Sequence, residues 1–143
     1  GVQTCALPIY MKQKIKDMKT VNVFQGSASA IYSTPSAEMQ AAKKPEGVLQ
    51  PLVRTNPENG KKALYLSSLH TIAFDGMTEE ESRPVIEMLN DHCIEPEFTC
   101  RVQWQPGQLT IWDNRCVLHN AINDYHGFRR EMRRLTVGPE VPR

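Results

Sequence analysis

Hydrophobic residues recur at helical spacing near the start of the chain. Met11, Ile15 and Met18 lie three or four positions apart within a basic stretch, and this period predicts the end of a surface helix over residues 11–21. Residues 22–50 keep no period, which predicts a long loop with one short helical turn at most. A loop of that length within a compact domain often covers a functional site.

A hairpin is predicted next. Two strand-like runs, residues 52–55 and 62–66, flank the sequence NPENG at residues 56–60. Asn-Gly between such runs is a strong turn signal because both residues tolerate positive φ.

The clearest helix signal starts at Thr78. Thr78 and Glu81 fit a capping box, in which each side chain satisfies a backbone amide of the first turn. Side chains then recur at helical spacing: Val85, Met88, Leu89 and His92. Pro84 has no amide hydrogen, so the regular helix is expected to begin near residues 80–82, with Pro84 in its first turn.

The carboxy-terminal third shows the two-residue period of strands. Alternate positions from Phe98 to Trp104 are apolar, which is typical of a half-buried strand. Pro106-Gly107 is placed for a type II turn. Further strands are predicted over residues 109–112, 116–122 and 129–137. Short strands with closely spaced turns predict a mainly β protein with short helices, built as a sandwich or barrel.

Composition narrows the class of protein. The chain has 143 residues, 17 Lys and Arg against 16 Asp and Glu, and 40% hydrophobic residues. No apolar run approaches the roughly 18 residues of a membrane-spanning helix, and neither collagen nor a disordered chain has this composition. A net charge of +1 argues against nucleic-acid binding, which needs a concentrated basic face. The length allows one ordinary core or half of a larger one, and we expect the second.

The four cysteines, Cys5, Cys93, Cys100 and Cys116, form no CxxC pair. We therefore expect reduced thiols rather than a disulfide scaffold. No signal-peptide pattern is present at the amino terminus, which together with the thiols predicts a cytoplasmic protein. Cys116 and His119 have the spacing of half a zinc site, but no second half occurs, so zinc is not expected.

Charge is concentrated in two places. Residues 75–97 carry eight acidic side chains and one arginine, which predicts a solvated face. Residues 129–134 carry four arginines and one glutamate, and guanidinium groups are common ligands of carboxylate and sulfonate anions. In a strand, Arg130 and Arg134 would share a face, about 13 Å apart. A solvated edge strand with surface arginines explains the same pattern, and His119 can equally be a core or edge histidine.

Three motifs in the carboxy-terminal third resemble a known signature: WDNRCVLH at 112–119, Asp-Tyr at 124–125 and RREMRR at 129–134. They are similar to the carboxy-terminal signature of the TauD/TfdA family, the taurine and dichlorophenoxyacetate dioxygenases. Upstream segments resemble the hairpin, helix and strand that precede it in the family: residues 51–65, 81–82 and 96–98. The resemblance covers about residues 52–137 in register.

The resemblance implies an enzyme that depends on iron(II) and 2-oxoglutarate. It would hydroxylate a small organic anion with dioxygen and release succinate and carbon dioxide. The implied fold is a double-stranded β-helix, the cupin-like jelly roll, of which residues 10–143 would form the carboxy-terminal portion of a single domain. Residues 1–9 do not fit and resemble a translated sequencing-adapter scar. Expected partners are a sulfonate, carboxylate or sulfate ester, with neither nucleic acid nor membrane, and the full-length enzyme could be a homo-oligomer.

The resemblance also implies roles for single residues. His119 would be the second histidine of a two-histidine, one-carboxylate iron site. Arg130 would bind the distal carboxylate of 2-oxoglutarate through two parallel hydrogen bonds, and Arg134 would face the anionic group of the substrate. Trp112 and Asn114 would pack around His119 and orient it.

Two departures from the family pattern matter. His70 stands where many members carry an aromatic residue near the substrate, which makes taurine itself a poor candidate. No His-x-Asp or His-x-Glu unit, which would supply the other two metal ligands, occurs in the chain. By the family's layout that unit would precede Tyr10, together with a threonine that contacts 2-oxoglutarate. A single imidazole cannot retain iron(II), so this chain alone is expected to be metal-free and inactive.

Two other functions stay open. A small, non-enzymatic β-rich module could use the same arginine-bearing face to hold an anion or a partner. A related 2-oxoglutarate enzyme could act on an amino acid or a betaine. An upstream His-x-Asp unit would favour an enzyme, whereas a native start at Met11 would favour the module.

Overall fold

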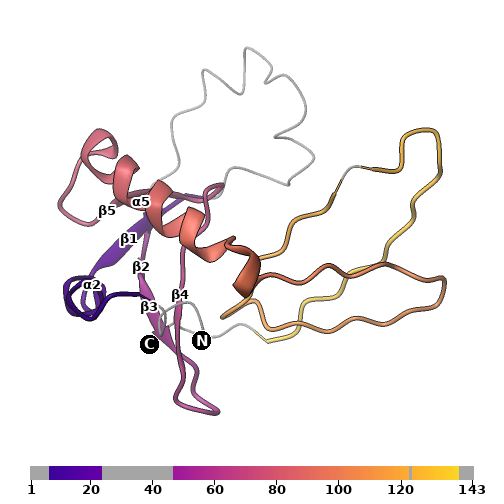
Figure 1. The fold of residues 1–143 in the computed structure, drawn as a ribbon, viewed down its shortest axis with the longest axis horizontal. Coiled ribbons are helices and arrows are strands. Elements are labelled where there is room, and N and C mark those ends of the chain that lie inside the picture. Colours follow the sequence, from indigo (N-terminus) through magenta and orange to yellow (C-terminus); the bar gives the residue numbers. More distant parts are fainter. Residues whose placement is uncertain (1–6, 24–46, 123, 139–143) are drawn as a thin grey trace.

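The computed structural model describes residues 7–23, 47–122 and 124–138. Its regular elements are, in chain order, α2 (Ile9–Ile15), β1 (Lys19–Asn22), β2 (Val48–Pro51), β3 (Val53–Thr55), β4 (Lys62–Leu64), β5 (Thr71–Phe74), α5 (Glu79–Cys93) and the 3-10 helix η1 (Pro96–Phe98). The strands form a three-stranded antiparallel sheet, ordered β2-β1-β5, and a two-stranded antiparallel sheet of β3 and β4 (Figure 1). The predicted class, mainly β with few helices, is confirmed.

The helix predicted over residues 11–21 is wrong beyond Ile15. The chain turns after α2 and forms β1, the central strand of the three-stranded sheet. Thr20 of β1 is fully buried between β2 and β5. Backbone hydrogen bonds to a strand on each side outweigh the helical spacing of the apolar residues, because pairing satisfies the buried backbone groups of β1.

Parts of two predicted segments lie outside the described residues. Of the loop predicted over residues 22–50, residues 24–46 are not described, and Val48 to Gln50 already belong to β2. Residues 1–6 are not described either, whereas Leu7 is buried in the core. The expectations for the loop and for residues 1–9 therefore stay predictions.

The predicted hairpin is confirmed. β3 and β4 pair antiparallel, with Val53 opposite Leu64 and Thr55 opposite Lys62. The amide of Asn56 donates a hydrogen bond to the Lys61 carbonyl at 2.8 Å, which closes the turn. The turn also needs a residue in the left-handed region, and a glycine supplies it at position 60 with φ 68°.

The predicted capping box of α5 is confirmed. The Thr78 hydroxyl accepts a hydrogen bond from the Glu81 amide at 3.2 Å, and the Glu81 carboxylate accepts one from the Thr78 amide at 2.9 Å. The helix begins directly after Thr78, earlier than predicted, so Pro84 lies inside the helix rather than in its first turn. Because Pro84 and Glu80 are exposed, water can satisfy the Glu80 carbonyl that lacks an amide partner.

The core lies where α5 covers the strands. It contains Leu7, Ile15, Leu52, Leu64, Leu66, Phe74, Ile86, Leu89 and Cys93. A buried hydrogen bond of 2.9 Å from the Phe74 amide to the Ser82 hydroxyl ties β5 to α5. Burial raises the pKa of the Cys93 thiol to about 11. Cys93, Cys100 and Cys116 are free thiols.

The four strands predicted between Phe98 and Val137 are wrong for the described residues. Pro96–Phe98 form η1, and residues 99–138, here called the arm, contain no strand where the structure describes them. The arm runs as long loops to one side of the body (Figure 1). The turn at Pro106-Gly107 is confirmed, with Gly107 at φ 77° and a hydrogen bond from the Gln108 amide to the Gln105 carbonyl.

The apolar side chains of the arm's alternating pattern are exposed rather than buried on one face of a sheet. Leu109, Ile111, Leu135 and Val137 are 82%, 85%, 93% and 90% exposed. Strand propensity is realised when a residue fits a pleated surface that is covered on one face and paired at its edge. Within the described residues, the arm has neither a cover nor a paired strand.

Candidate functional site

Trp112 and His119 lie together in the arm. Their ring centroids are 5.0 Å apart, and the ring planes meet at 51°. Trp112 Nε1 donates a hydrogen bond to Asn114 Oδ1 at 2.8 Å. A turn brings the rings together, because the Asp113 carbonyl accepts hydrogen bonds from the amides of residues 116 and 117. The structure therefore gathers three of the residues predicted for the site.

Arg134 acts on His119 through its charge. Desolvation by burial, chiefly, and the positive charge of Arg134 lower the pKa of His119. Both effects disfavour the imidazolium form. His119 is exposed overall, and its contact with Trp112 removes part of the water around the ring. The neutral imidazole that results is the form that binds metals.

Two arginines of the arm are available to an anion. The Arg130 guanidinium lies 5.3 Å from the centroid of the Tyr125 ring. Where the structure describes the chain, neither Arg130 nor Arg134 forms an ion pair, whereas Arg129 binds Glu131 at 2.6 Å. The shared strand face predicted for Arg130 and Arg134 is not formed, because residues 129–137 are not a strand in the described residues.

Arg115 joins the arm to the hairpin. Its Nη2 lies 3.0 Å from Glu58 Oε1 and 2.8 Å from Asp113 Oδ2. Asn56 Nδ2 donates to the same Asp113 oxygen at 3.4 Å. The hydrogen bond from Arg115 is the main reason that the pKa of Asp113 is lowered. Sequence reasoning missed this cluster, because Asp-Asn-Arg marks a turn but does not identify partners 57 positions away.

His70 lies in the turn before β5. Its amide donates to the Ser67 carbonyl at 3.1 Å, and its carbonyl accepts from the Val23 amide at 2.8 Å. The next residue, Thr71, donates its hydroxyl to Asn22 Oδ1 at 2.7 Å. The three-stranded sheet therefore fixes the His70 backbone, while the other predicted site residues belong to the arm.

The described residues do not complete an iron site. Among them, no three His, Cys, Asp or Glu side chains gather as a metal site. A two-histidine, one-carboxylate centre needs three such groups, and His119 supplies one imidazole. Arg130 and Arg134, by contrast, each carry a guanidinium group of the kind that binds a carboxylate in a bidentate manner.

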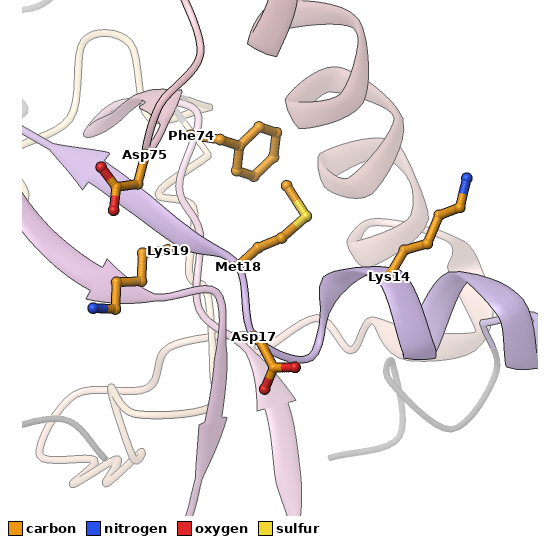
Figure 2. A pocket seen from close by; sticks show the side chains of 6 residues that line it. All are labelled: Lys14, Asp17, Met18, Lys19, Phe74 and Asp75. Atoms are coloured by element: carbon orange, nitrogen blue, oxygen red, sulfur yellow. The ribbon is translucent and has the colours of Figure 1, made fainter.

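Two hollows lie away from the predicted residues. One, of about 360 Å³, is lined by Lys14, Asp17, Met18, Lys19, Phe74 and Asp75. Figure 2 shows Met18 and Phe74 facing each other while Lys14 and Asp17 point outward. A groove of about 630 Å³ lies between α2 and α5. None of the predicted site residues lines either one.

A family comparison identifies what kind of chain this is. Residues 6–136 match the model of the Taurine catabolism dioxygenase TauD, TfdA family. The chain belongs to the TauD/TfdA family. The resemblance carried by the motifs of the arm is therefore confirmed.

Named relatives agree with this family. The chain is 33% identical over 131 residues to the alpha-ketoglutarate-dependent 2,4-dichlorophenoxyacetate dioxygenase of Cupriavidus pinatubonensis, covering 92% of this chain and 45% of that protein. It is 37% identical over 93 residues to the alpha-ketoglutarate-dependent sulfate ester dioxygenase of Pseudomonas putida, covering 64% and 30%. The chain thus spans less than half the length of these relatives.

The chain is also similar to part of a solved structure of a taurine dioxygenase. The taurine dioxygenase of Burkholderia xenovorans is 29% identical with a TM-score of 0.63, over 80% of this chain and 35% of that one. The relatives from Cupriavidus pinatubonensis and Pseudomonas putida are named as alpha-ketoglutarate-dependent dioxygenases, so the predicted enzyme class is confirmed at the level of the family. No helix within the described ranges is both long and apolar enough to cross a bilayer.

Proposed function

We propose that this chain supplies the anion-binding arginines and one metal-binding histidine of an iron(II)- and 2-oxoglutarate-dependent dioxygenase. The arrangement of Trp112, His119 and Arg134 carries the proposal. A neutral imidazole packed on an indole and close to a guanidinium suits a site that binds a metal beside an anion. The family match of residues 6–136 supports the same assignment.

Each residue has a role in this proposal. Arg130 binds the distal carboxylate of 2-oxoglutarate, and Arg134 binds the anionic group of the primary substrate. Trp112 and Asn114 orient His119, the one metal ligand in this chain. Iron and 2-oxoglutarate supply the oxidising chemistry when they are bound. The described residues do not complete the iron site. In this proposal the other two metal ligands therefore come from residues outside the described ranges.

The substrate class we propose is a small organic carboxylate, sulfonate or sulfate ester. Named relatives act on 2,4-dichlorophenoxyacetate and on sulfate esters, both of them anions. A single guanidinium such as Arg134 binds any of these groups through parallel hydrogen bonds. In this proposal His70 lies near the substrate, at a position where many family members carry an aromatic residue, and this departure disfavours taurine.

We further propose the fold and setting of the complete protein. Residues 10–143 form the carboxy-terminal portion of one double-stranded β-helix domain, supported by the TM-score of 0.63 with a taurine dioxygenase of which the match covers 35%. Free thiols at Cys93, Cys100 and Cys116 favour a reducing, cytoplasmic location. The complete enzyme can be a homo-oligomer.

Succinate formation tests the proposed function. The protein encoded by the whole reading frame is incubated with iron(II), 2-oxoglutarate, dioxygen and one candidate: an aryloxyacetate, an alkyl sulfate or taurine. We expect the first or second, but not taurine, to stimulate succinate release, and Arg134→Gln to abolish this stimulation. The matched control is Arg129→Gln, whose arginine pairs with Glu131 within the arm. The proposal would be refuted if the unmodified protein failed to bind 2-oxoglutarate and released no additional succinate with any of the three candidates.

One observation favours a second candidate, a non-enzymatic anion-binding module. The described residues offer unpaired arginines but no complete set of metal ligands. For such a module, the chain would bind small dicarboxylates equally well with and without iron(II). A dioxygenase instead binds 2-oxoglutarate more tightly with iron(II), because the metal adds ligand contacts.

A further inference from the structure

Arg115 sits at the centre of a cluster of hydrogen bonds. Its Nε lies 2.9 Å and 3.0 Å from the two Asp113 carboxylate oxygens, and its Nη2 reaches Asp113 Oδ2 at 2.8 Å. The same Nη2 reaches Glu58 Oε1 at 3.0 Å. One guanidinium therefore holds two carboxylates, one from the arm and one from the hairpin turn.

The backbone of the arm is tied to this cluster. The amide of Arg115 donates to Asp113 Oδ1 at 2.9 Å, so the Asp113 carboxylate closes the turn from within. The Asp113 carbonyl accepts from the amides of Cys116 and Val117 at 3.2 and 3.1 Å, which directs the chain toward His119. The Asp113 carboxylate therefore belongs to the turn that joins Trp112 to His119.

The hairpin gives this turn an anchor outside the arm. Glu58 belongs to the closed turn between β3 and β4, and its own amide donates to the Asn56 side chain at 2.9 Å. Asn56 in turn donates to Asp113 at 3.4 Å. An isolated exposed ion pair contributes little to stability. Here, however, the cluster orients a segment that has no strand partner among the described residues.

We infer that Glu58 and Arg115 are positioning residues, which hold the Trp112 and His119 rings in contact through Asp113. The inference rests on the proposed function only for the role of His119. It extends the candidate site to the hairpin, whose sequence carries no chemistry of its own in the proposal.

Histidine NMR tests the inference without iron or 2-oxoglutarate. The chain is fused to a histidine-free solubilising domain, labelled at its histidines and studied at a pH of about 8, where the imidazole is neutral. The ring current of Trp112, 5.0 Å away, shifts the His119 ring protons. His119→Gln assigns the resonance, and Trp112→Ala gives the shift that corresponds to complete loss of the contact.

Arg115→Gln is expected to move the His119 resonance through about half or more of the Trp112→Ala shift, while the resonances of His92 in α5 stay in place. Glu58→Gln should move it in the same direction by less, and the double variant no further than Arg115→Gln alone. Arg115→Lys, which keeps the charge but not the planar fork, should fall between Arg115→Gln and the unmodified chain. The control Arg129→Gln, which breaks an ion pair inside the arm, should leave the resonance unchanged.

Two outcomes would overturn the inference. One is a His119 resonance that does not move in folded Arg115→Gln. The other, if Arg115→Gln fails to fold, is an unmoved resonance in Glu58→Gln, which removes only the exposed end of the cluster. Failure of the proposed function appears instead as absent 2-oxoglutarate binding and turnover, while the expected shifts of the His119 resonance in the Arg115 and Glu58 variants still occur.

Discussion

Arg134 lies close enough to His119 for its charge to lower the pKa of the imidazole, a smaller effect than the desolvation of the ring itself. Arg134→Gln removes that charge and is expected to raise the pKa of His119, while leaving it below the ordinary value of 6.5. An NMR titration of the His119 ring protons measures it. A pKa that falls, or that rises equally in Arg129→Gln, would contradict the assigned cause.

The lowered pKa also fixes the sign of a pH effect. The unfolded chain binds the His119 proton more readily than the folded arm does, so acid favours the unfolded arm. Stability of the Trp112–His119 contact is therefore lost as the pH falls through about 6.5, and none is gained above it. Tryptophan emission should report this change between neutral and mildly acidic buffer, and His119→Gln should lack it.

Arg130 is predicted to carry the affinity for 2-oxoglutarate. A lost hydrogen bond to a charged group costs about 1.5–3 kcal/mol, roughly 10- to 150-fold in affinity. Arg130→Gln in the complete protein is expected to weaken 2-oxoglutarate binding at least by this factor, measured calorimetrically. Arg130→Lys should recover only part of it, because lysine lacks the bidentate fork. Unchanged binding in Arg130→Gln would assign the dicarboxylate to another group.

The hairpin and the start of α5 could be predicted because their causes are local. The turn at residues 56–60 and the Thr78–Glu81 capping box both depend on residues only a few positions apart. The strand β1 could not be predicted, because its partners, β2 and β5, come later in the chain. Helical spacing near Met18 was a weaker influence than pairing on both edges.

In the candidate site, too, contacts between residues close in sequence could be predicted, and contacts between distant residues could not. The family resemblance implied that Trp112 and Asn114 pack around His119, and the structure places the rings of Trp112 and His119 5.0 Å apart, while the role of His119 stays a prediction. The role of Glu58 was not predictable, because its contact with Arg115 joins two turns distant in sequence. The strands of the arm were predicted from alternation alone, which specifies a face but not the sheet that must cover it.

Ser82 is predicted to link the sheet to α5. It is fully buried, accepts a hydrogen bond from the Phe74 amide and donates one to the Thr78 carbonyl at 2.7 Å. Ser82→Ala leaves the buried amide without its partner, which costs about 1–3 kcal/mol. Hydrogen exchange at the Phe74 amide should accelerate accordingly. Ser67→Ala, at a half-buried serine outside α5, is the control and should leave the Phe74 amide protected.

Iron(II) binding by the 143-residue chain alone is predicted to be undetectable. His119 supplies one imidazole, and no set of three metal-binding side chains gathers in the described ranges. Anaerobic titration should give no binding heat, and added 2-oxoglutarate should give no charge-transfer absorbance. Micromolar binding that His119→Gln leaves intact would show that the metal ligands lie elsewhere in this chain. Micromolar binding that His119→Gln abolishes would show that the chain completes the site itself.

The arm is predicted to make the isolated chain unfold without a sharp transition. Leu109, Ile111, Leu135 and Val137 are more than four-fifths exposed, so the arm contributes little burial to the cooperative unit formed by α5 and the strands. Exposed apolar surface also binds hydrophobic dyes and promotes association. We expect a broad thermal melt and dye binding already at low temperature.

Replacing Leu109 and Leu135 by Gln should reduce dye binding, while the matched change of buried Leu89 to Gln should increase it. A single sharp, two-state melt of a monomer that binds no dye would show that the arm is covered in solution.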